Sequence, residues 1–273
     1  MKYADLHLHT TFSDGTYSPE ELVTKSLEAG LSAIAVCDHD TVLALPSCTD
    51  IGLKNGIEVI PAIELSAESD SQEIHILGYF IDYSSKSLNE KLLNLHNIRV
   101  ERVHKIIAKL KRIGIDLDPE AVFAVSGSGT VSRLHIARAM YKQGLINSVF
   151  EAFHKYIGDK GPAYVLGFKL SPDKAIRLIR DSGGIPVLAH PYVVKNDDLL
   201  HDLIKKGLMG LEVYYPEHSQ SMINFYLELA KNNNLLITGG SDCHGTAKPE
   251  VRIGSIKIPY ELVEKLKEAK DKL

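Results

Sequence analysis

Short apolar strands alternate with amphipathic helices over most of this chain, and that alternation restricts the fold more than any other feature. The first unit has a strand at residues 2–9, followed by a helix that begins after Ser18. Ser18 is placed to cap this helix, and Glu21 to complete a capping box. Further strands are expected at residues 33–37, 58–63 and 73–80. Parallel strands joined by crossover helices are the usual product of such a pattern, so we predict an α/β fold.

The alternation stops between residues 83 and 163. A long helix is predicted over residues 87–112, because apolar residues recur there at helical spacing, and glycine and proline breakers follow it. The pattern resumes with a helix at residues 172–182 and strands at residues 185–189, 211–214, 235–238 and 253–258. We therefore expect one barrel from residues 1–82 and 164–273, and a helical insert at residues 83–163 that caps the barrel mouth.

The net charge and the cysteines exclude several classes of protein. A formal net charge of -4 provides no general attraction to nucleic acid or to an anionic membrane, so we expect neither stable duplex binding nor membrane association. No apolar run approaches the roughly 20 residues of a membrane helix, and residues 1–8 show no secretory signal. Three cysteines without metal-type spacing fit a reducing compartment. We expect a cytoplasmic protein.

Histidines and carboxylates recur directly after the predicted strands. His7 and His9 are two residues apart, so on a strand both imidazoles face the same side, and Asp242 and His244 repeat this spacing. In a barrel of parallel strands the carboxyl ends converge on one face. One histidine in such a place is more often an ordinary core residue, but the complete set predicts a metal site. The predicted metal ligands are His7, His9, Asp14, His39, Glu64, His75, His190, Asp242 and His244.

Nine nitrogen and oxygen donors exceed what one catalytic zinc ion uses, which is about three protein ligands. Two or three divalent cations with a bridging carboxylate would use them all, and mixed imidazole and carboxylate donors suit Mn, Zn and Fe alike. Clustered cations favour phosphate ester hydrolysis, in which a metal-bridging hydroxide attacks phosphorus in line. We expect Glu64, His39 and Asp242 to be indispensable to catalysis, with Asp38 and Asp40 orienting His39.

These motifs resemble the polymerase and histidinol phosphatase family, usually called the PHP family. The matching motifs are Asp5-Leu6-His7-Leu8-His9, Ser13-Asp14-Gly15, Asp38-His39-Asp40, Ile63-Glu64, His75, Ala189-His190-Pro191 and Gly240-Ser241-Asp242-Cys243-His244-Gly245. The resemblance implies a distorted (β/α)7 TIM-like barrel with an inserted helical subdomain and a trinuclear site bridged by Glu64. It implies three ion sites: His7, His9, Glu64 and Asp242; Glu64, His75 and His190; and Asp14, His39 and His244.

Within that family the chain looks most like the stand-alone nucleotide phosphoesterases. These include 3',5'-bisphosphate nucleotide phosphatases and enzymes that trim short RNA from its 5' end. The supporting segments are residues 132–138, 156–159 and 212–218. Ser132 and Leu134 stand where Gly and Pro are expected, and Cys37 and Cys243 also depart from the pattern, but no departure removes a metal donor. The expected partner is a small phosphorylated substrate such as a nucleotide or a short RNA.

Four further residues are candidates for substrate binding. Arg99, Arg133 and His135 lie in the insert, where guanidinium groups are suited to bidentate contacts with phosphate. Arg99 also fits a charged, solvated helix face, and His218 could contact substrate, protonate a leaving group or simply begin a helix. Histidinol-phosphate hydrolysis with a different lid is the alternative within enzymes, and a non-catalytic metal-dependent binding module is the alternative of another class. An amidohydrolase-like reaction lacks an obvious carboxylated lysine.

Overall fold

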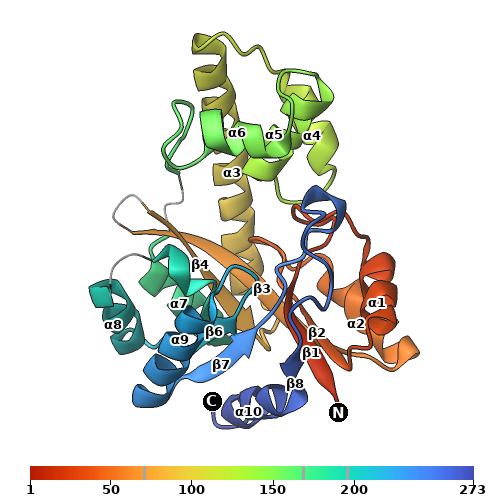
Figure 1. Cartoon of the computed structure of the whole chain (residues 1–273), viewed down its shortest axis with the longest axis vertical. Coiled ribbons are helices and arrows are strands. Elements are labelled where there is room, and N and C mark those ends of the chain that lie inside the picture. The colour runs from red at the N-terminus through yellow and green to blue at the C-terminus, as the bar shows by residue number, and fades with distance from the viewer. Residues whose placement is uncertain (70–71, 168–169, 195–196) are drawn as a thin grey trace.

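A single sheet of eight strands organises the part of the chain that the computed structural model describes, namely residues 1–69, 72–167, 170–194 and 197–273. The strand order is β7-β6-β5-β4-β3-β2-β1-β8. The strands are β1 (Tyr3–Leu8), β2 (Ala33–Val36), β3 (Glu58–Ser69), β4 (Gln72–Tyr79), β5 (Ile185–Leu188), β6 (Gly210–Tyr214), β7 (Leu236–Gly239) and β8 (Ile258–Pro259). Figure 1 shows these strands below a group of helices.

The helices occupy two places relative to this sheet. Those around the barrel are α1 (Pro19–Glu28), α2 (Leu45–Asn55), α7 (Pro172–Asp181), α8 (Asp197–Lys205), α9 (Gln220–Asn232) and α10 (Tyr260–Lys270), with short turns η2 (Pro191–Val193) and η3 (Gly245–Ala247). Those above it are α3 (Lys86–Arg112), α4 (Pro119–Ser126), α5 (Arg133–Lys142), α6 (Val149–Ala152) and the π-helical turn η1 (Phe153–Ile157). Among the described residues, no helix has both the length and the apolar character needed to cross a membrane.

The sheet is mostly parallel, as predicted, with one exception in its middle. β1, β2 and β3 pair in parallel, and so do β5, β6 and β7. β4 is antiparallel to both β3 and β5. The prediction of parallel strands throughout is therefore wrong at β4, because Ser69 and Gln72 are register partners and the two residues between them are too few for a crossover helix.

The barrel is nearly closed, because the segment after β7 reaches back to β1. Leu8 forms a parallel bridge with Cys243, and the Asp242 N–H donates to the carbonyl of His7 at 2.8 Å. Near the start of β1, β8 pairs with this strand in antiparallel fashion. This is the distorted TIM-like barrel that the sequence resemblance implied.

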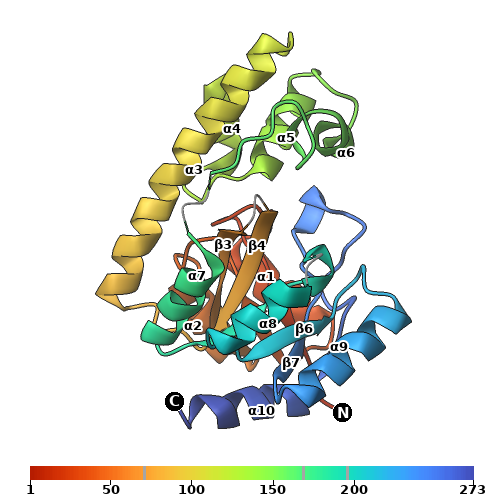
Figure 2. The same ribbon diagram turned by 90° about the vertical axis from the view of Figure 1, so that its left-hand side faces the viewer.

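The apolar core divides according to the alternation of side chains along each strand. In β2, Ala33 and Ala35 belong to the cluster inside the barrel, whereas Ile34 and Val36 belong to the cluster under the surrounding helices. α10 contributes Val263 to the inner cluster, and both views show this helix across the end of the barrel where the N-terminus lies (Figures 1 and 2).

Local signals predicted most helix and strand boundaries correctly. Ser18 and Glu21 form both bonds of the expected capping box at α1, and the predicted long helix is α3. The last strand is an exception, since of the predicted residues 253–258 only Ile258 lies in β8. Gly254 adopts a φ of 71° and donates its N–H to Asp5 at 2.9 Å, so the chain turns there instead of extending.

The long helix α3 joins the barrel to the helices above it, as Figure 2 shows. Leu88 and Leu92 in its first half pack in the barrel's outer cluster, whereas Val103 and Ile106 in its second half belong to a separate cluster. Residues of α4 and α5 complete this separate cluster. The helices above the barrel therefore have an apolar core of their own.

Candidate metal centre

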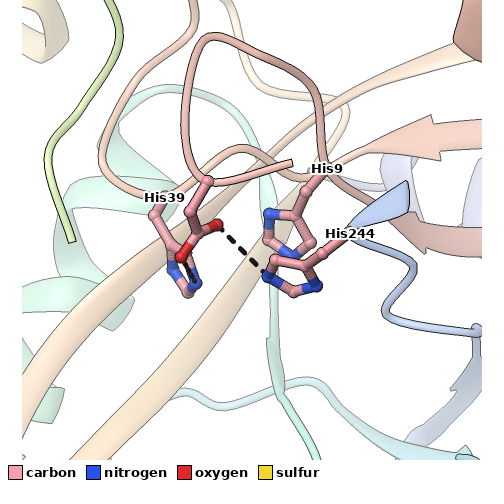
Figure 3. A group of neighbouring side chains, drawn as sticks. His9, His39 and His244 are labelled. Carbon is pink, nitrogen blue, oxygen red and sulfur yellow. Dashed lines mark ion pairs between the residues drawn. The ribbon is translucent and has the colours of Figure 1, made fainter. Parts of the chain in front are cut away.

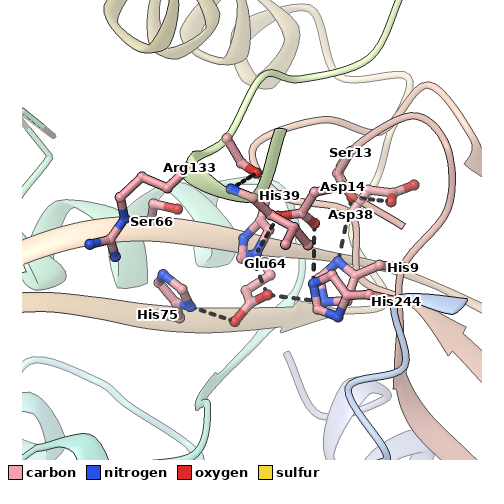
Figure 4. A network of polar contacts seen from close by, with 12 residues as sticks. His9, Ser13, Asp14, Asp38, His39, Glu64, Ser66, His75, Arg133 and His244 are labelled. Atoms are coloured by element: carbon pink, nitrogen blue, oxygen red, sulfur yellow. Dashed lines mark hydrogen bonds and ion pairs between the residues drawn. The ribbon is translucent and has the colours of Figure 1, made fainter. Parts of the chain in front are cut away.

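All nine predicted donors come together at one end of the barrel, beneath the helices. β1 carries His7, and the loop after it carries His9 and Asp14. Glu64 and His75 lie on β3 and β4, and the remaining four donors follow strands: His39 follows β2, His190 follows β5, and Asp242 and His244 follow β7. A backbone bridge between His39 and Glu64 extends the pairing of β2 and β3 into the site. Figure 4 shows Glu64 in the middle of this group.

Several donor atoms lie within ion-pair distance of one another but do not form hydrogen bonds. His9 Nε2 lies 3.0 Å from Asp242 Oδ1, and His39 Nδ1 lies 3.2 Å from Glu64 Oε2. Asp14 Oδ1 lies 3.2 Å from His244 Nε2. Within the described chain, His9 Nε2, His39 Nδ1 and Asp14 Oδ1 are nevertheless buried with no hydrogen-bond partner. Buried polar atoms rarely lack partners, so these atoms fit a shared cation better than they fit each other.

Three groups of donors are compact enough to hold an ion, each with its ligand atoms within 4.8 Å of one another. The groups are His7, His9, Glu64 and Asp242; His9, Asp14, His39 and His244; and His39, Glu64 and His75. His190 borders the third group, because its Nε2 lies 3.2 Å from Glu64 Oε1. Figure 3 shows the imidazoles of His9, His39 and His244 facing one another, with ring centroids of His9 and His244 4.2 Å apart.

The electrostatics of the cluster suit cation binding. Burial opposes ionisation of Glu64, but the neighbouring His75 and His7 outweigh it and hold the pKa of that carboxyl well below its usual value. Burial also lowers the pKa of His39 well below its usual value, which keeps this imidazole in the neutral form that ligates metals. His9 differs, since Asp242 and Glu64 overcome its burial and raise its pKa to about 9. Protons and cations therefore compete for the same atoms.

Two glutamates, Glu212 buried and Glu73 partly buried, stand behind the donors, and neither was predicted from the sequence. Glu212 Oε1 accepts from His7 Nδ1 at 2.8 Å, which leaves His7 Nε2 facing Glu64. Glu73 Oε1 accepts from His75 Nε2 at 3.2 Å, which leaves His75 Nδ1 facing Glu64. A carboxylate on the far ring nitrogen is the usual way of fixing a metal-binding histidine. The available signals were an acid inside the apolar strand β6, and an acid two residues before His75 on β4.

The aspartates beside His39 do not orient it, contrary to the prediction. Asp38 accepts hydrogen bonds from the Thr10 N–H and from the hydroxyls of Thr10 and Ser13. Asp40 accepts from the Ser66 N–H at 2.9 Å and from Arg99 Nε at 2.7 Å. Asp38 therefore holds the loop between His9 and Asp14, and Asp40 secures the neighbouring strand and helix.

Asp5 has a comparable role on the other side of the site. It accepts from the N–H and the hydroxyl of Ser241 at 2.8 Å and 2.6 Å. These bonds fix the loop that carries Asp242 and His244. Gly240 in that loop leaves no room for a side chain, because an added Cβ would lie 2.4 Å from the backbone nitrogen of His7. The glycine therefore permits the close approach of this loop to His7.

A cavity of about 1000 Å³ opens above the donors. Its lining includes Asp14, His39, Glu64, His75, Asp242 and His244 at one end, and residues of α5, α6 and η1 at the other. Arg133 and Arg99, two of the four candidate substrate-binding residues, line it, and the Arg133 guanidinium contacts Glu73 at 3.1 Å and Asp159 at 2.7 Å. Lys248, which the sequence analysis did not single out, also lines it and contacts Asp242 at 3.2 Å.

The other predicted substrate-binding residues make protein contacts that the sequence did not reveal. Arg99 is only 4% exposed, so it does not lie on the solvated helix face that the sequence also allowed. It donates hydrogen bonds to Asp40, Ser66 and Val131. Of these predicted residues, His135 and His218 do not line the large cavity. His135 Nδ1 accepts the Ser132 N–H at 3.0 Å as part of the α5 capping box. His218 Nδ1 donates to the Val213 carbonyl at 2.8 Å, among three tyrosines.

A nearly closed α/β barrel, with buried imidazoles and carboxylates at the end that opens into a cavity, defines the chain as a metal-dependent hydrolase. Its sequence matches the family described as PHP domain over residues 5–161. The match covers more than half of the 273 residues. The chain belongs to the PHP domain family, and it is a phosphoesterase of that family.

Relatives of known name extend over nearly the whole chain. A 5'-3' exoribonuclease from Haemophilus influenzae is 33% identical, covering 89% of this chain and 90% of the relative. A phosphoribosyl 1,2-cyclic phosphate 1,2-diphosphodiesterase from Eggerthella lenta is 30% identical, covering 88% and 94%. A 3',5'-nucleoside bisphosphate phosphatase from Chromobacterium violaceum is 28% identical, covering 89% and 88%.

Solved structures agree with these sequence matches. The structure of an inferred metal-dependent phosphoesterase from Bifidobacterium adolescentis superposes with a TM-score of 0.87 and 28% sequence identity. The superposition covers 96% of this chain and 94% of that one. The helices above the barrel are therefore shared with that protein, together with the barrel itself.

Proposed function

We propose that this protein hydrolyses phosphate esters of nucleotides or short oligonucleotides, with a nucleoside 3',5'-bisphosphate or the 5' end of an RNA as substrate. The observation that carries the proposal is the cluster of nine donors, seven of them buried, with unpartnered ligand atoms at one end of a cavity that Arg133 also lines. The names of the Haemophilus influenzae and Chromobacterium violaceum relatives support the nucleotide and RNA substrates.

The nine donors would hold two or three divalent cations of Mn, Zn or Fe. Glu64 takes part in two of the three compact groups, which supports its role as the bridging ligand. When bound, such cations activate water as a nucleophile and offset charge on the phosphoryl oxygens. His39, Glu64 and Asp242 are then indispensable, because each belongs to a compact donor group and its removal deletes a ligand.

The chain's own side chains prepare the site for that chemistry. Glu73 and Glu212 orient His75 and His7, so that one nitrogen of each ring faces Glu64. The guanidinium of Arg133 offsets negative charge on the phosphoryl group, since guanidinium and phosphate match in charge and geometry. The helical insert at residues 83–163 acts as a lid on the barrel of residues 1–82 and 164–273. The shared lining of the large cavity supports this role.

One relative supports a second substrate class. The Eggerthella lenta relative is named for a phosphoribosyl cyclic phosphate, which carries a ribose and no nucleobase. The same donors would serve a cyclic phosphodiester, because the water and the phosphoryl oxygens need the same stabilisation. The residues of the insert that line the cavity then determine which of the two substrate classes binds.

Phosphate release, together with chromatography of the nucleotide and sugar phosphate products, tests the proposal directly. Protein loaded with manganese or stripped by chelator would be assayed on AMP, adenosine 3',5'-bisphosphate, a short 5'-phosphorylated RNA, ribose 1,2-cyclic phosphate 5-phosphate and histidinol phosphate. We expect metal-dependent turnover of a nucleotide or the RNA. Turnover of histidinol phosphate alone would contradict the proposal and indicate a histidinol-phosphate phosphatase. No turnover of any substrate with metal bound would favour a non-catalytic binding module.

The variant Glu64→Gln tests the role of the cluster in the same assay. We expect it to lose bound metal and more than about 100-fold in turnover, because even residues behind the ligands contribute about 10- to 100-fold. Glu58→Gln is the matched control, since Glu58 begins the same strand and contacts Lys267 instead of the donors. Retention of both metal and activity by Glu64→Gln would contradict the proposed centre.

A further inference from the structure

The large cavity has two chemically different ends. Its lining at one end consists of the imidazoles and carboxylates of the metal centre. At the other end the insert contributes the apolar side chains Leu134, Tyr141, Val149, Phe150 and Phe153. A phosphate and two or three ions do not need an apolar wall, and the volume of about 1000 Å³ lies at the upper end for sites that enclose small organic ligands. The cavity is therefore built for a substrate with an apolar part.

Phe150 is the most exposed residue of this wall. Its side chain is 76% exposed, although uncovered apolar surface is unfavourable by about 25 cal/mol per Å². Its ring is nearly parallel to that of His154 one turn later, at an interplanar angle of 9° and a centroid distance of 5.7 Å. His154 does not line the cavity, so Phe150 alone of this stacked pair presents an aromatic ring there, which suits a planar ligand better than an aliphatic one.

The backbone that presents Phe150 is held in place by hydrogen bonds. Ser148 caps α6 by accepting the Glu151 N–H at 3.1 Å, and the Asn147 amide donates to the Glu151 carboxylate at 3.0 Å. Lys155 in η1 contacts the same carboxylate at 2.9 Å. Glu151 therefore ties both sides of the segment together, and the exposed ring belongs to an ordered element.

We propose that Phe150 is a stacking platform for the nucleobase of the substrate, which makes it a specificity-determining residue. The inference rests on the proposed function, since it takes the phosphate to bind at the donor end and the base to extend toward the insert. Stacking of a base on an aromatic side chain contributes about 1–3 kcal/mol and tolerates any base, because every base has a π-face. The platform therefore selects phosphate esters that carry a nucleobase over sugar phosphates that lack one.

Steady-state kinetics with a matched pair of substrates test this platform. AMP and ribose 5-phosphate present the same phosphate on the same sugar and differ in the base. For Phe150→Ala we expect the KM for AMP to rise by about 5- to 100-fold, which is that stacking energy converted at 1.4 kcal/mol per factor of ten. The kinetics with ribose 5-phosphate and the kcat for AMP should stay close to wild type, and Phe150→Trp should restore the KM for AMP.

Phe225→Ala is the matched control for these kinetics. Phe225 is 51% exposed on α9, contacts Tyr226 and does not line the cavity, so its removal deletes an exposed ring elsewhere. Equal KM values for AMP in Phe150→Ala and Phe225→Ala would overturn the platform. An equal rise in KM for AMP and ribose 5-phosphate would overturn it as well, because the effect would then concern the phosphate end.

Tryptophan fluorescence separates failure of the platform from failure of the proposed function. The natural chain has no tryptophan, so Phe150→Trp and Phe225→Trp each introduce a single reporter. In zinc-loaded protein we expect AMP and adenosine to quench the reporter at position 150, ribose 5-phosphate to leave it unchanged, and the reporter at position 225 to respond to none. Quenching in a protein that hydrolyses no ester would retain the platform and reject the phosphoesterase. Hydrolysis without selective quenching of the reporter at position 150 would retain the phosphoesterase and reject the platform.

Discussion

At the scale of single residues, Glu73 joins the metal centre to the insert through one carboxylate. Its Oε1 accepts from His75 at 3.2 Å, and its Oε2 accepts from Arg102 and Arg133, both at 3.1 Å. Burial opposes ionisation of Glu73, but Arg133, His75 and Arg102 outweigh it and hold its pKa well below the usual value. The carboxylate therefore positions the ring of His75, a proposed metal ligand, together with the guanidinium of Arg133, a proposed phosphate-binding group.

Replacing Glu73 by Gln should weaken the centre without removing a ligand. The amide keeps the shape but loses the charge that fixes His75 and balances two arginines, so we expect metal affinity to fall by about 10- to 100-fold. Titration against a competing chelator measures this loss. Glu68→Gln is the control, because Glu68 is the register partner of Glu73 on β3 and accepts the Gly167 N–H instead. Unchanged affinity in Glu73→Gln would show that the carboxylate does not position the ligand.

At the scale of elements, α3 is attached to the barrel through a buried ion pair. Arg99 donates to Asp40 and to the hydroxyl of Ser66, both at 2.7 Å, and thereby ties the helix to the ends of β2 and β3. The sequence placed Arg99 on a charged helix face but did not show which way that face turns. Its contacts favour a structural role over direct binding of phosphate.

Arg99→Met should therefore destabilise the protein more than it affects substrate binding. The apolar side chain retains much of the volume but leaves the Asp40 carboxylate buried without its cation, which costs about 3–5 kcal/mol. The free energy of unfolding from chemical denaturation measures this cost. Arg112→Met at the exposed end of the same helix should stay within about 0.5 kcal/mol of wild type. A higher KM for the substrate in Arg99→Met, with an unchanged free energy of unfolding, would show that Arg99 binds the substrate directly.

The start of α5 has an unusual capping box in which His135 occupies the position of Glu or Gln. Its Nδ1 accepts the Ser132 N–H at 3.0 Å, so the ring must be unprotonated there. Burial lowers the pKa of His135 to about 4, against 6.5 for an exposed histidine. Between those two values the unfolded chain binds a proton that the folded chain does not. Folding stability therefore falls as the pH falls from about 6.5 to about 4.

His135→Gln should remove this component of the pH dependence while keeping the cap. Glutamine accepts the same N–H and does not titrate, so we expect the variant to match wild type above pH 6.5 and to exceed it by up to about 3 kcal/mol near pH 4. Denaturation of metal-free protein across this range measures the difference. Parallel stability curves for the two proteins would show that His135 protonates as easily when folded as when unfolded.

At the scale of the whole molecule, the metal centre connects most of the barrel. Its donors lie on or directly after β1, β2, β3, β4, β5 and β7, so bound cations would link strands from both halves of the sheet. Without cations, the carboxylates of Glu64, Asp14 and Asp242 are balanced only by protein groups such as His7 and Lys248. Metal binding should thus stabilise the fold as well as enable the reaction.

Chelation should lower the melting temperature reversibly. At free metal about 100-fold above its Kd, binding contributes about 2.7 kcal/mol, which corresponds to about 5–10 °C for a domain of this size. Calorimetry with chelator, and again after zinc or manganese is returned, measures the shift. Glu64→Gln should melt at the same temperature with and without added metal. An identical melting temperature for stripped and loaded wild type would mean that the centre does not bind the cation used.

The sequence by itself determined the local elements, because their signals are local. Periodicity distinguishes the strands from α3, and the spacing of Ser18 and Glu21 marks the start of α1. It also placed the donors next to strand ends, and barrel geometry then requires strand ends to meet on one face. Those two facts were sufficient for the fold class and for the choice of metal chemistry.

Only the tertiary structure decided which distant groups touch. Glu212 and His7 are 205 residues apart, and Arg99 and Asp40 are 59 apart, so no local pattern could pair them. The reversal at β4, the turn at Gly254 and the exposure of Phe150 depend likewise on how elements pack. The physical reason is that periodicity specifies which face of an element is apolar, whereas contacts between elements follow from their positions and angles in the folded chain.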